Sequence, residues 1–92
     1  MNVRRSKINI LVDILRLVQR KEGRAKPTHI LYGANLSHAR LKKYLDVLLV
    51  NEFIERADKG NHVFYRITLK GQKFISEFKK VEELSEAFGV PI

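Results

Sequence analysis

Apolar residues recur at helical spacing over residues 7–22, which predicts a first amphipathic helix. Its apolar positions are Ile8, Leu11, Ile14, Leu15 and Val18. Ser6 precedes the segment and suits a helix N-cap, and Gly23 follows it and suits a left-handed C-terminal residue. We therefore expect a helix that buries one face against the rest of the chain.

Two shorter helical segments follow, separated by a tight connection. Residues 27–33 begin with Pro27, which fits a first helical turn, and residues 38–50 follow Ser37 as a second N-cap. We expect Asn51 to end the later segment in the left-handed conformation. The apolar face of that segment carries Leu41, Tyr44, Leu45, Leu48 and Leu49. This spacing is that of a helix-turn-helix unit.

The periodicity then changes to that of strands. Residues 53–56 and 63–69 flank a turn cluster at residues 58–61, so they predict a hairpin with its tip near Gly60. Alternation places Phe64 and Arg66 on one face of the second strand. The opposite face carries Val63, Tyr65 and Ile67.

Helical spacing returns over residues 72–87, after Gly71. The order is three helices, two strands and a helix, which predicts an α+β, mainly α fold with a two-stranded β wing and a C-terminal helix. We interpret residues 1–92 as a single domain, with a core at 6–70 and the C-terminal helix at 71–88.

Three segments resemble the small archaeal winged helix-turn-helix transcriptional regulators: residues 28–37 (THILYGANLS), residues 41–45 (LKKYL) and residues 65–71 (YRITLKG). The resemblance extends over about residues 6–85. It implies a winged helix that binds DNA and that dimerises through the helix after the wing. The chain departs from related sequences at residues 51–53 (NEF), where those often carry a lysine-glycine pair.

Charge is unevenly distributed along the 92 residues. The formal net charge is +8, from 18 Lys+Arg against 10 Asp+Glu. Residues 1–43 hold eleven basic residues against two acidic ones, and residues 44–92 hold seven against eight. A basic half beside a near-neutral half indicates one face that meets a polyanion. The alternative is a solubilising charge without a partner.

The second helix of the helix-turn-helix unit is the expected recognition helix. Ala39 and Lys43 fall opposite its buried face, and an exposed helix of this kind fits a DNA major groove. Arg40 could read guanine in bidentate fashion, and lysines more often meet phosphate. The candidate residues here are Ser37, His38, Ala39, Arg40, Lys42 and Lys43. The alternative interpretation is a solvated basic face.

Two flanking segments are further candidates for DNA contact. The start of the preceding helix suits a phosphate, although simple capping is an equal alternative, and its candidates are Lys26, Thr28 and His29. The hairpin could reach a minor groove or the backbone, although it could be an ordinary turn, and its candidates are Lys59, Asn61 and Arg66. Arg4, Arg5 and Lys7 form a basic arm that either touches DNA or is merely disordered.

The last helix repeats apolar residues at near-heptad spacing. Four of them exceed what a small core needs and predict a symmetric homodimer: Phe78, Val81, Leu84 and Phe88. The alternative is packing of these residues on the helix's own domain.

Several classes of function are excluded by what the sequence lacks. Without cysteine there are no disulfides, thiolate metal sites or cysteine nucleophiles. His29, His38 and His62 lie on different elements without paired ligand spacing, so we expect no metal site, no catalytic residue and no cofactor. The longest apolar run, residues 47–50, is far below the roughly 20 residues of a membrane span. We expect a cytoplasmic, nucleoid-associated protein without a small-molecule substrate.

Three functions remain. The first is a sequence-specific regulator that binds double-stranded DNA, with residues 37–50 in the major groove and the wing at residues 56–66 on the backbone or minor groove. The second is a non-specific architectural or chromatin-type DNA binder. The third is a winged helix used for protein contacts. The ratio of specific to random DNA affinity separates the first from the second.

Overall fold

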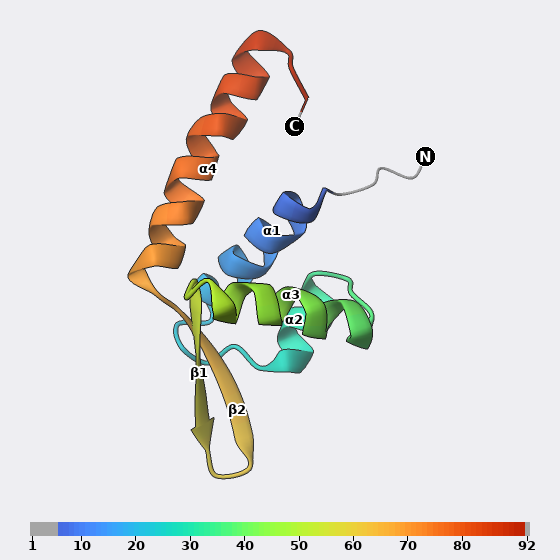
Figure 1. Cartoon of the computed structure of the whole chain (residues 1–92), viewed down its shortest axis with the longest axis vertical. Helices are drawn as coiled ribbons and strands as arrows, with labels where there is room; N and C mark the ends of the chain where they lie inside the picture. Colours follow the sequence, from blue (N-terminus) through green and yellow to red (C-terminus); the bar gives the residue numbers. More distant parts are fainter. Residues whose placement is uncertain (1–5, 92) are drawn as a thin grey trace.

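A computed structural model describes residues 6–91 of the chain (Figure 1). Its elements are α1 (Lys7–Arg20), α2 (Pro27–Gly33), α3 (His38–Val50), β1 (Ile54–Lys59), β2 (His62–Ile67) and α4 (Leu69–Phe88). This order confirms the predicted one, and α2 and α3 have the predicted bounds. Of the predicted basic arm, Arg4 and Arg5 lie outside the described residues, whereas Lys7 is the exposed first residue of α1.

Helix α1 is the central element, because it contacts α2, α4 and β2. The Ser6 hydroxyl accepts a hydrogen bond from the Asn9 N–H at 3.2 Å, as expected of an N-cap. The buried side chains of α1 are Ile10, Val12, Ile14, Leu15, Leu17 and Val18. Of the predicted face, Ile8 is 39% exposed and Leu11 is half-buried. The surface includes other residues instead, because neighbours cover α1 on several sides. The helix ends at Arg20 rather than residue 22, since Glu22 and Gly23 both adopt positive φ.

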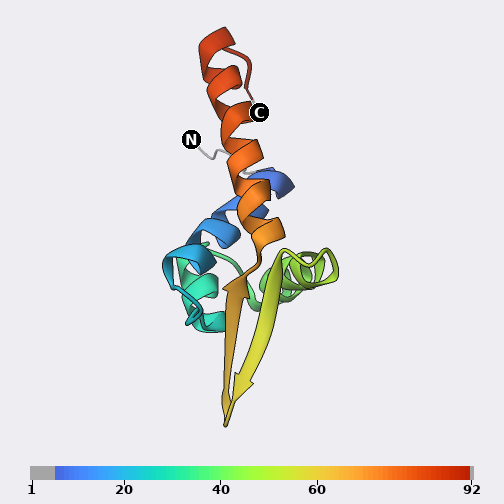
Figure 2. The same cartoon turned by 90° about the vertical axis from the view of Figure 1, so that its left-hand side faces the viewer.

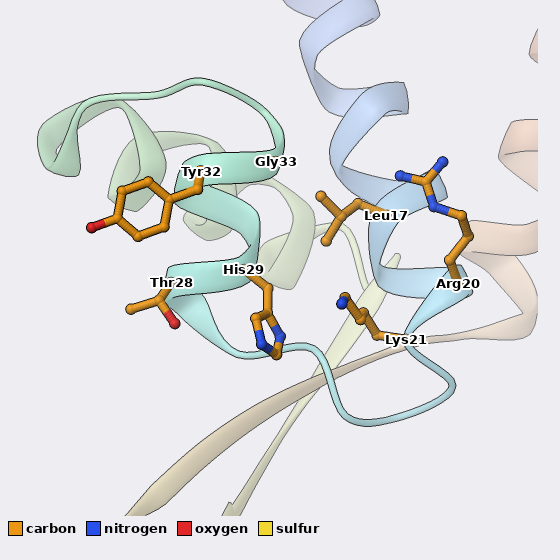
Figure 3. Close-up of a pocket in the computed structure, with 7 residues that line it drawn as sticks. All are labelled: Leu17, Arg20, Lys21, Thr28, His29, Tyr32 and Gly33. Atoms are coloured by element: carbon orange, nitrogen blue, oxygen red, sulfur yellow. The ribbon is translucent and has the colours of Figure 1, made fainter.

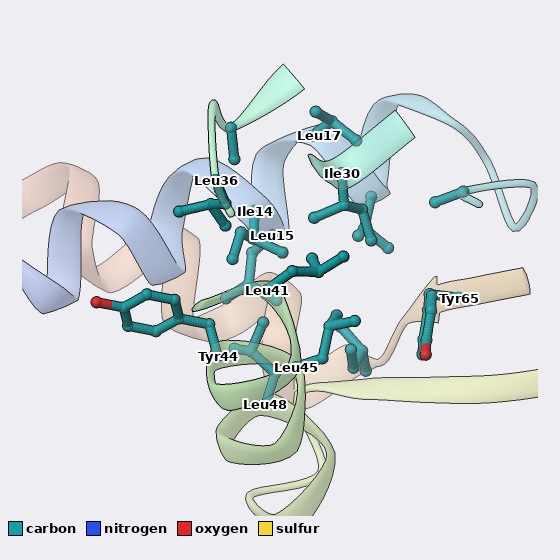
Figure 4. Close-up of a cluster of buried hydrophobic side chains, with 14 of the residues drawn as sticks. Ile14, Leu15, Leu17, Ile30, Leu36, Leu41, Tyr44, Leu45, Leu48 and Tyr65 are labelled. Carbon is teal, nitrogen blue, oxygen red and sulfur yellow. The ribbon is translucent and has the colours of Figure 1, made fainter. Parts of the chain in front are cut away.

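The hydrophobic core lies between α1, α2 and α3 and extends to the base of the hairpin (Figure 4). Ile14, Ile30 and Leu48 are fully enclosed there. Tyr65 brings β2 into the same cluster. The core therefore fixes the orientation of α3, whose opposite side stays exposed.

The end of α3 corrects one prediction. Asn51 has φ −83°, and Glu52 is the left-handed residue with φ +61°. The Asn51 side-chain amide donates to the Val47 carbonyl at 2.7 Å, and the Phe53 N–H donates to the Leu48 carbonyl at 2.9 Å. These bonds are those of a helix end whose left-handed position comes one residue after the cap, which is why the prediction was wrong by one residue.

The hairpin formed by β1 and β2 is a twisted antiparallel ribbon, called the wing below. Lys59 pairs with His62 across a two-residue turn, and Gly60 in that turn has φ +61°. A positive φ at the first turn position strongly favours glycine. The predicted tip is therefore confirmed, although Asp58 and Lys59 belong to β1 rather than to the turn. The Tyr65 N–H also donates to the Ala25 carbonyl at 2.8 Å, which ties β2 to the α1–α2 connection.

Helix α4 begins at Leu69, two residues before the predicted C-terminal helix at 71–88 and three before the helical spacing at 72–87. The Thr68 hydroxyl caps it by accepting from the Gly71 N–H at 3.0 Å. A side chain on Gly71 would collide with the Phe53 carbonyl, so this glycine allows α4 to start close against the α3–β1 turn. The far end of α4 and the wing project in opposite directions from the core (Figures 1 and 2), over dimensions of 49 × 31 × 21 Å.

Candidate nucleic-acid interface

Helix α3 presents a basic outward face. Its inner face is closed by Leu41, Tyr44, Leu45 and Leu48, all at most 6% exposed. The Ser37 hydroxyl caps the helix by accepting from the Arg40 N–H at 3.3 Å, as predicted. Four side chains share the exposed outer side: Ala39, Lys42, Lys43 and Asp46. Lys42 and Lys43 have no carboxylate partner among residues 6–91, so their charge is available to an anion.

A groove of about 220 Å³ separates α3 from the wing. Its polar lining comes from His38, Lys42 and Asp46 on α3 and from Arg56 and Tyr65 on the wing. Burial raises the pKa of the Tyr65 phenol, so the hydroxyl stays protonated at neutral pH and remains a donor. The groove thus combines two cations, a hydroxyl donor and one carboxylate.

Asp46 is a groove residue that the sequence-based candidate set omits. Arg56 is recognisable in the sequence as a cation of the wing, but its place in the groove is not. The helical wheel that selected Ala39 and Lys43 also places Asp46 beside them, so this signal was present. Arg56 needed the register, which pairs it with Tyr65 and turns both toward the α3 side of the wing.

Both wing arginines are held by carboxylates. Arg66 Nη2 lies 2.5 Å from Glu55 Oε2, its cross-strand neighbour, and Arg56 Nε lies 2.9 Å from Asp58 Oδ1. Arg66 is on the wing face turned away from α3, with its stem beside Gly23. Of the predicted wing contacts, Lys59 and Asn61 are exposed at the tip without such a partner in the described structure, whereas Arg66 is already engaged.

The start of α2 brings two predicted residues toward the wing and α1. The Lys26 ammonium lies 5.9 Å from the centre of the Phe64 ring. The Lys26 N–H donates to His29 Nδ1 at 3.2 Å, so neutral His29 carries its proton on Nε2. Thr28 is exposed and its hydroxyl is open to a ligand.

Arg40 does not extend from the outward face of α3. Its guanidinium donates to the Tyr44 hydroxyl at 3.4 Å and lies 5.9 Å from the Tyr44 ring centre. Tyr44 is on the flank of α3 that does not line the groove. In this conformation the Arg40 guanidinium, predicted to contact guanine, therefore does not point in the same direction as Ala39 and Lys43.

Helix α4 divides into a covered half and an uncovered one. Phe78 is only 5% exposed and lies one turn before Glu82, which pairs with Arg16 of α1 at 2.5 Å. Phe78 thus shares the face of α4 that meets α1, and its prediction as a free dimer contact is corrected. The other predicted contacts are exposed: Val81 at 45%, Leu84 at 59% and Phe88 at 73%. They line an apolar hollow of about 310 Å³ with the chain that follows the helix.

Within residues 6–91 no cluster of three His, Asp or Glu side chains is placed to hold a metal ion. None of the described helices is long and apolar enough to cross a membrane.

Comparison with known proteins identifies the family to which this architecture belongs. A family model described as winged helix-turn-helix matches residues 4–86, which is most of the chain. The chain belongs to the winged helix-turn-helix family. This winged helix is 37% identical over 83 residues to the protein MJ0290 of Methanocaldococcus jannaschii, covering 90% of this chain and 36% of that protein. It therefore spans about a third of that relative's length.

Solved structures agree with the family. Sso10a-2, a DNA-binding protein from Sulfolobus solfataricus, matches this winged helix with a TM-score of 0.73 at 30% identity, over 92% of this chain and 90% of that chain. MepR, a transcription regulator of the Staphylococcus aureus multidrug efflux pump MepA, gives a TM-score of 0.73 at 15% identity, over 87% and 62%. The second likeness shows the fold alone. The resemblance to archaeal winged helices is confirmed.

Proposed function

We propose that this winged helix is a sequence-specific regulator of transcription that binds double-stranded DNA and has no enzymatic activity. The observation that carries the proposal is the outward face of α3, where Lys42 and Lys43 are exposed without a carboxylate partner among the described residues. A major groove admits one helix, and unpaired cations on it meet the phosphates that border the groove. The proposal places the protein in the cytoplasm, on the nucleoid.

The other candidate residues take roles that follow from their positions. Ser37, His38 and Ala39 lie at the start of α3, the end of a recognition helix that meets base edges. Lys26, Thr28 and His29 contact the backbone beside it, and Lys59 and Asn61 extend the contact from the wing tip. Arg66 joins them only by exchanging Glu55 for a phosphate.

The exposed end of α4 supports a homodimer. Leu84 and Phe88 are large apolar side chains on a helix that projects beyond the core (Figures 1 and 2). A second copy that packs there by two-fold symmetry covers both patches at once. Two recognition helices about one DNA turn apart then read a pseudo-palindromic site.

Sedimentation at tens of micromolar tests the dimer. We expect the parent chain and the control Glu83→Gln, exposed on the same helix, to have the dimer mass. The double variant Leu84→Gln/Phe88→Gln should have the monomer mass. A parent chain that sediments as a monomer contradicts the dimer.

Selection from a randomised duplex pool, repeated across a salt series, tests the main proposal. One enriched palindrome that persists at physiological salt supports the specific regulator. Binding without an enriched motif, with an affinity that falls steeply in salt, contradicts it, because phosphate contacts carry no base preference. A parent chain that binds no duplex contradicts DNA binding altogether and favours a protein-interaction module.

One observation favours the second candidate, a non-specific architectural DNA binder. Arg40, whose guanidinium is the best bidentate reader on α3, rests against Tyr44. The outward face then consists of lysines, an alanine and Asp46, which offers phosphate contacts in greater number than base contacts. The same selection experiment distinguishes the two candidates.

A further inference from the structure

A hollow of about 490 Å³ lies between the end of α1 and α2, away from α3 (Figure 3). Its floor is apolar and closely packed, because a side chain on Gly33 would collide with Leu17 Cδ1. Its walls are polar: Arg20 and Lys21 come from the α1 side, and Thr28, His29 and Tyr32 come from α2. Close helix packing thus builds a floor with donors around it.

The charge around this hollow is not neutralised. Arg20, Lys21, Arg24 and Lys26 fall within seven residues that contain one acid, Glu22. None of the four cations has a carboxylate partner in the part of the chain that the structure describes. One helical turn earlier, by contrast, Arg16 is paired with Glu82 at 2.5 Å. Positive charge without an internal partner is what an anion site requires.

The uncharged groups in the hollow are also donors. His29 Nδ1 accepts from the Lys26 backbone, which leaves Nε2–H as the free donor of the neutral ring. The Thr28 and Tyr32 hydroxyls add two further neutral donors, and no carboxylate lines the hollow. Two cations and three neutral donors without an acid match a phosphate group, whose oxygens are acceptors only.

The hollow adjoins the surface that carries the proposed DNA contacts. Lys26 lies over Phe64 of the wing, and Ala25 is hydrogen-bonded to Tyr65. The wing therefore lies between α3 on one side and the α1–α2 connection on the other (Figure 2). A duplex that engages α3 and the wing tip has its neighbouring backbone on the side of this connection.

We propose that the hollow binds a backbone phosphate of duplex DNA, through Arg20 and Lys21 with Thr28 and His29, and so extends the footprint from α3, the wing and the start of α2 to the end of α1. The inference rests on the proposed DNA binding. It assigns a binding role to Arg20 and Lys21, whose place in the sequence indicates only charges suited to a helix C-terminus.

The test compares two double variants that remove the same charge. Arg20→Gln/Lys21→Gln empties the hollow of cations, and Lys73→Gln/Lys79→Gln removes two exposed, unpaired lysines from α4 as a control. Affinity for a duplex is measured across a salt series. We expect the log–log salt slope to fall by about 0.9 for each phosphate that the first variant no longer neutralises, and to stay at the parent value in the control. Base preference should be unchanged in both variants. In Arg20→Gln/Lys21→Gln, the stretch of duplex protected from hydroxyl radicals should be shorter at the flank of the binding site.

Two outcomes overturn the proposal. One is equal slopes for the parent and Arg20→Gln/Lys21→Gln while Lys42→Gln/Lys43→Gln weakens binding, which rejects the hollow but leaves the proposed function intact. The other outcome is that the hollow binds free anions but not DNA. In that case inorganic phosphate shifts the NMR signals of Arg20, Lys21 and His29, yet the salt slope of Arg20→Gln/Lys21→Gln equals that of the parent. A parent chain that binds no duplex is a failure of the proposed function itself.

Discussion

The α3 surface carries lysines and the wing carries arginines, and the two sets of cations lie in different electrostatic settings. On the wing, Arg56 and Arg66 each contact a carboxylate, at 2.9 and 2.5 Å. On α3, Lys42 and Lys43 project into solvent, and no carboxylate among residues 6–91 pairs with them. The two surfaces therefore differ in free charge far more than in composition.

This difference decides which cations contribute to binding a polyanion. A paired arginine must leave its carboxylate before it meets a phosphate, so the gain is the difference between two similar interactions. An unpaired lysine releases counterions from the duplex without giving up an internal partner. We therefore expect α3 to dominate the affinity and the wing to add little until its carboxylates are removed.

The largest effect should come from removing the free charge on α3. Lys42→Gln/Lys43→Gln should lower the affinity for any duplex roughly ten- to a hundredfold, because the variant cannot form two charge-assisted hydrogen bonds to phosphate. The salt slope should fall by up to about 1.8. Fluorescence anisotropy with a labelled duplex measures both, and an affinity within about twofold of the parent would show that α3 is not the binding surface.

Freeing the wing should have the opposite sign. Glu55→Gln/Asp58→Asn releases Arg66 and Arg56 together, and we expect a roughly three- to tenfold gain in affinity with a steeper salt slope. Such exposed ion pairs contribute little to stability, so the fold should persist. Glu77→Gln/Glu83→Gln, which removes two exposed carboxylates from α4 and frees Lys80, is the matched control and should bind like the parent. Unchanged affinity in the double variant would mean that the wing stays off the duplex.

Asp46 sharpens the comparison because it is the acid on the free surface. Asp46→Asn removes repulsion from phosphate and should raise the affinity for random duplex roughly threefold. A carboxylate is also the group that accepts a hydrogen bond from a cytosine amino group, so we expect the ratio of selected to random affinity to fall if Asp46 meets a base. Equal gains on both duplexes would show that Asp46 reads no base.

The smallest effect should come from Lys59 at the wing tip. It is exposed and unpaired in the described structure, but it is one charge beside Asp58. Lys59→Gln should reduce the salt slope by at most about 0.9 and leave base preference unchanged. Identical binding at low salt would remove the wing tip from the footprint.

The elements of the fold were largely predictable because their signals are local. Ser6 and Ser37 each cap a helix by accepting a hydrogen bond from the N–H three residues later, and Gly60 permits a turn of two residues. Such bonds depend only on the order of residues. The errors are local too: the left-handed residue after α3 is Glu52 rather than Asn51, and Thr68 starts α4 earlier than expected.

The candidate site was predictable only in part. The helical wheel of α3 correctly separated buried from exposed residues. It could not predict the contact of Arg40 with Tyr44. Counting charge gave each arginine equal weight, whereas Arg66 proved to be held by Glu55. A residue's availability to a ligand depends on its neighbours in space, and the sequence pattern gives only its side of the helix or strand.

The sequence by itself determined the order of helices and strands, the outward face of α3 and the excess of positive charge. Tertiary structure alone decided where that charge stays free. Arg16 finds Glu82 66 residues away, Phe78 is covered beside α1, and Gly33 lets α2 lie close enough to α1 to form the basic hollow. The physical reason is range: helix and turn signals act over about three or four residues, whereas ion pairing and burial depend on how distant elements pack.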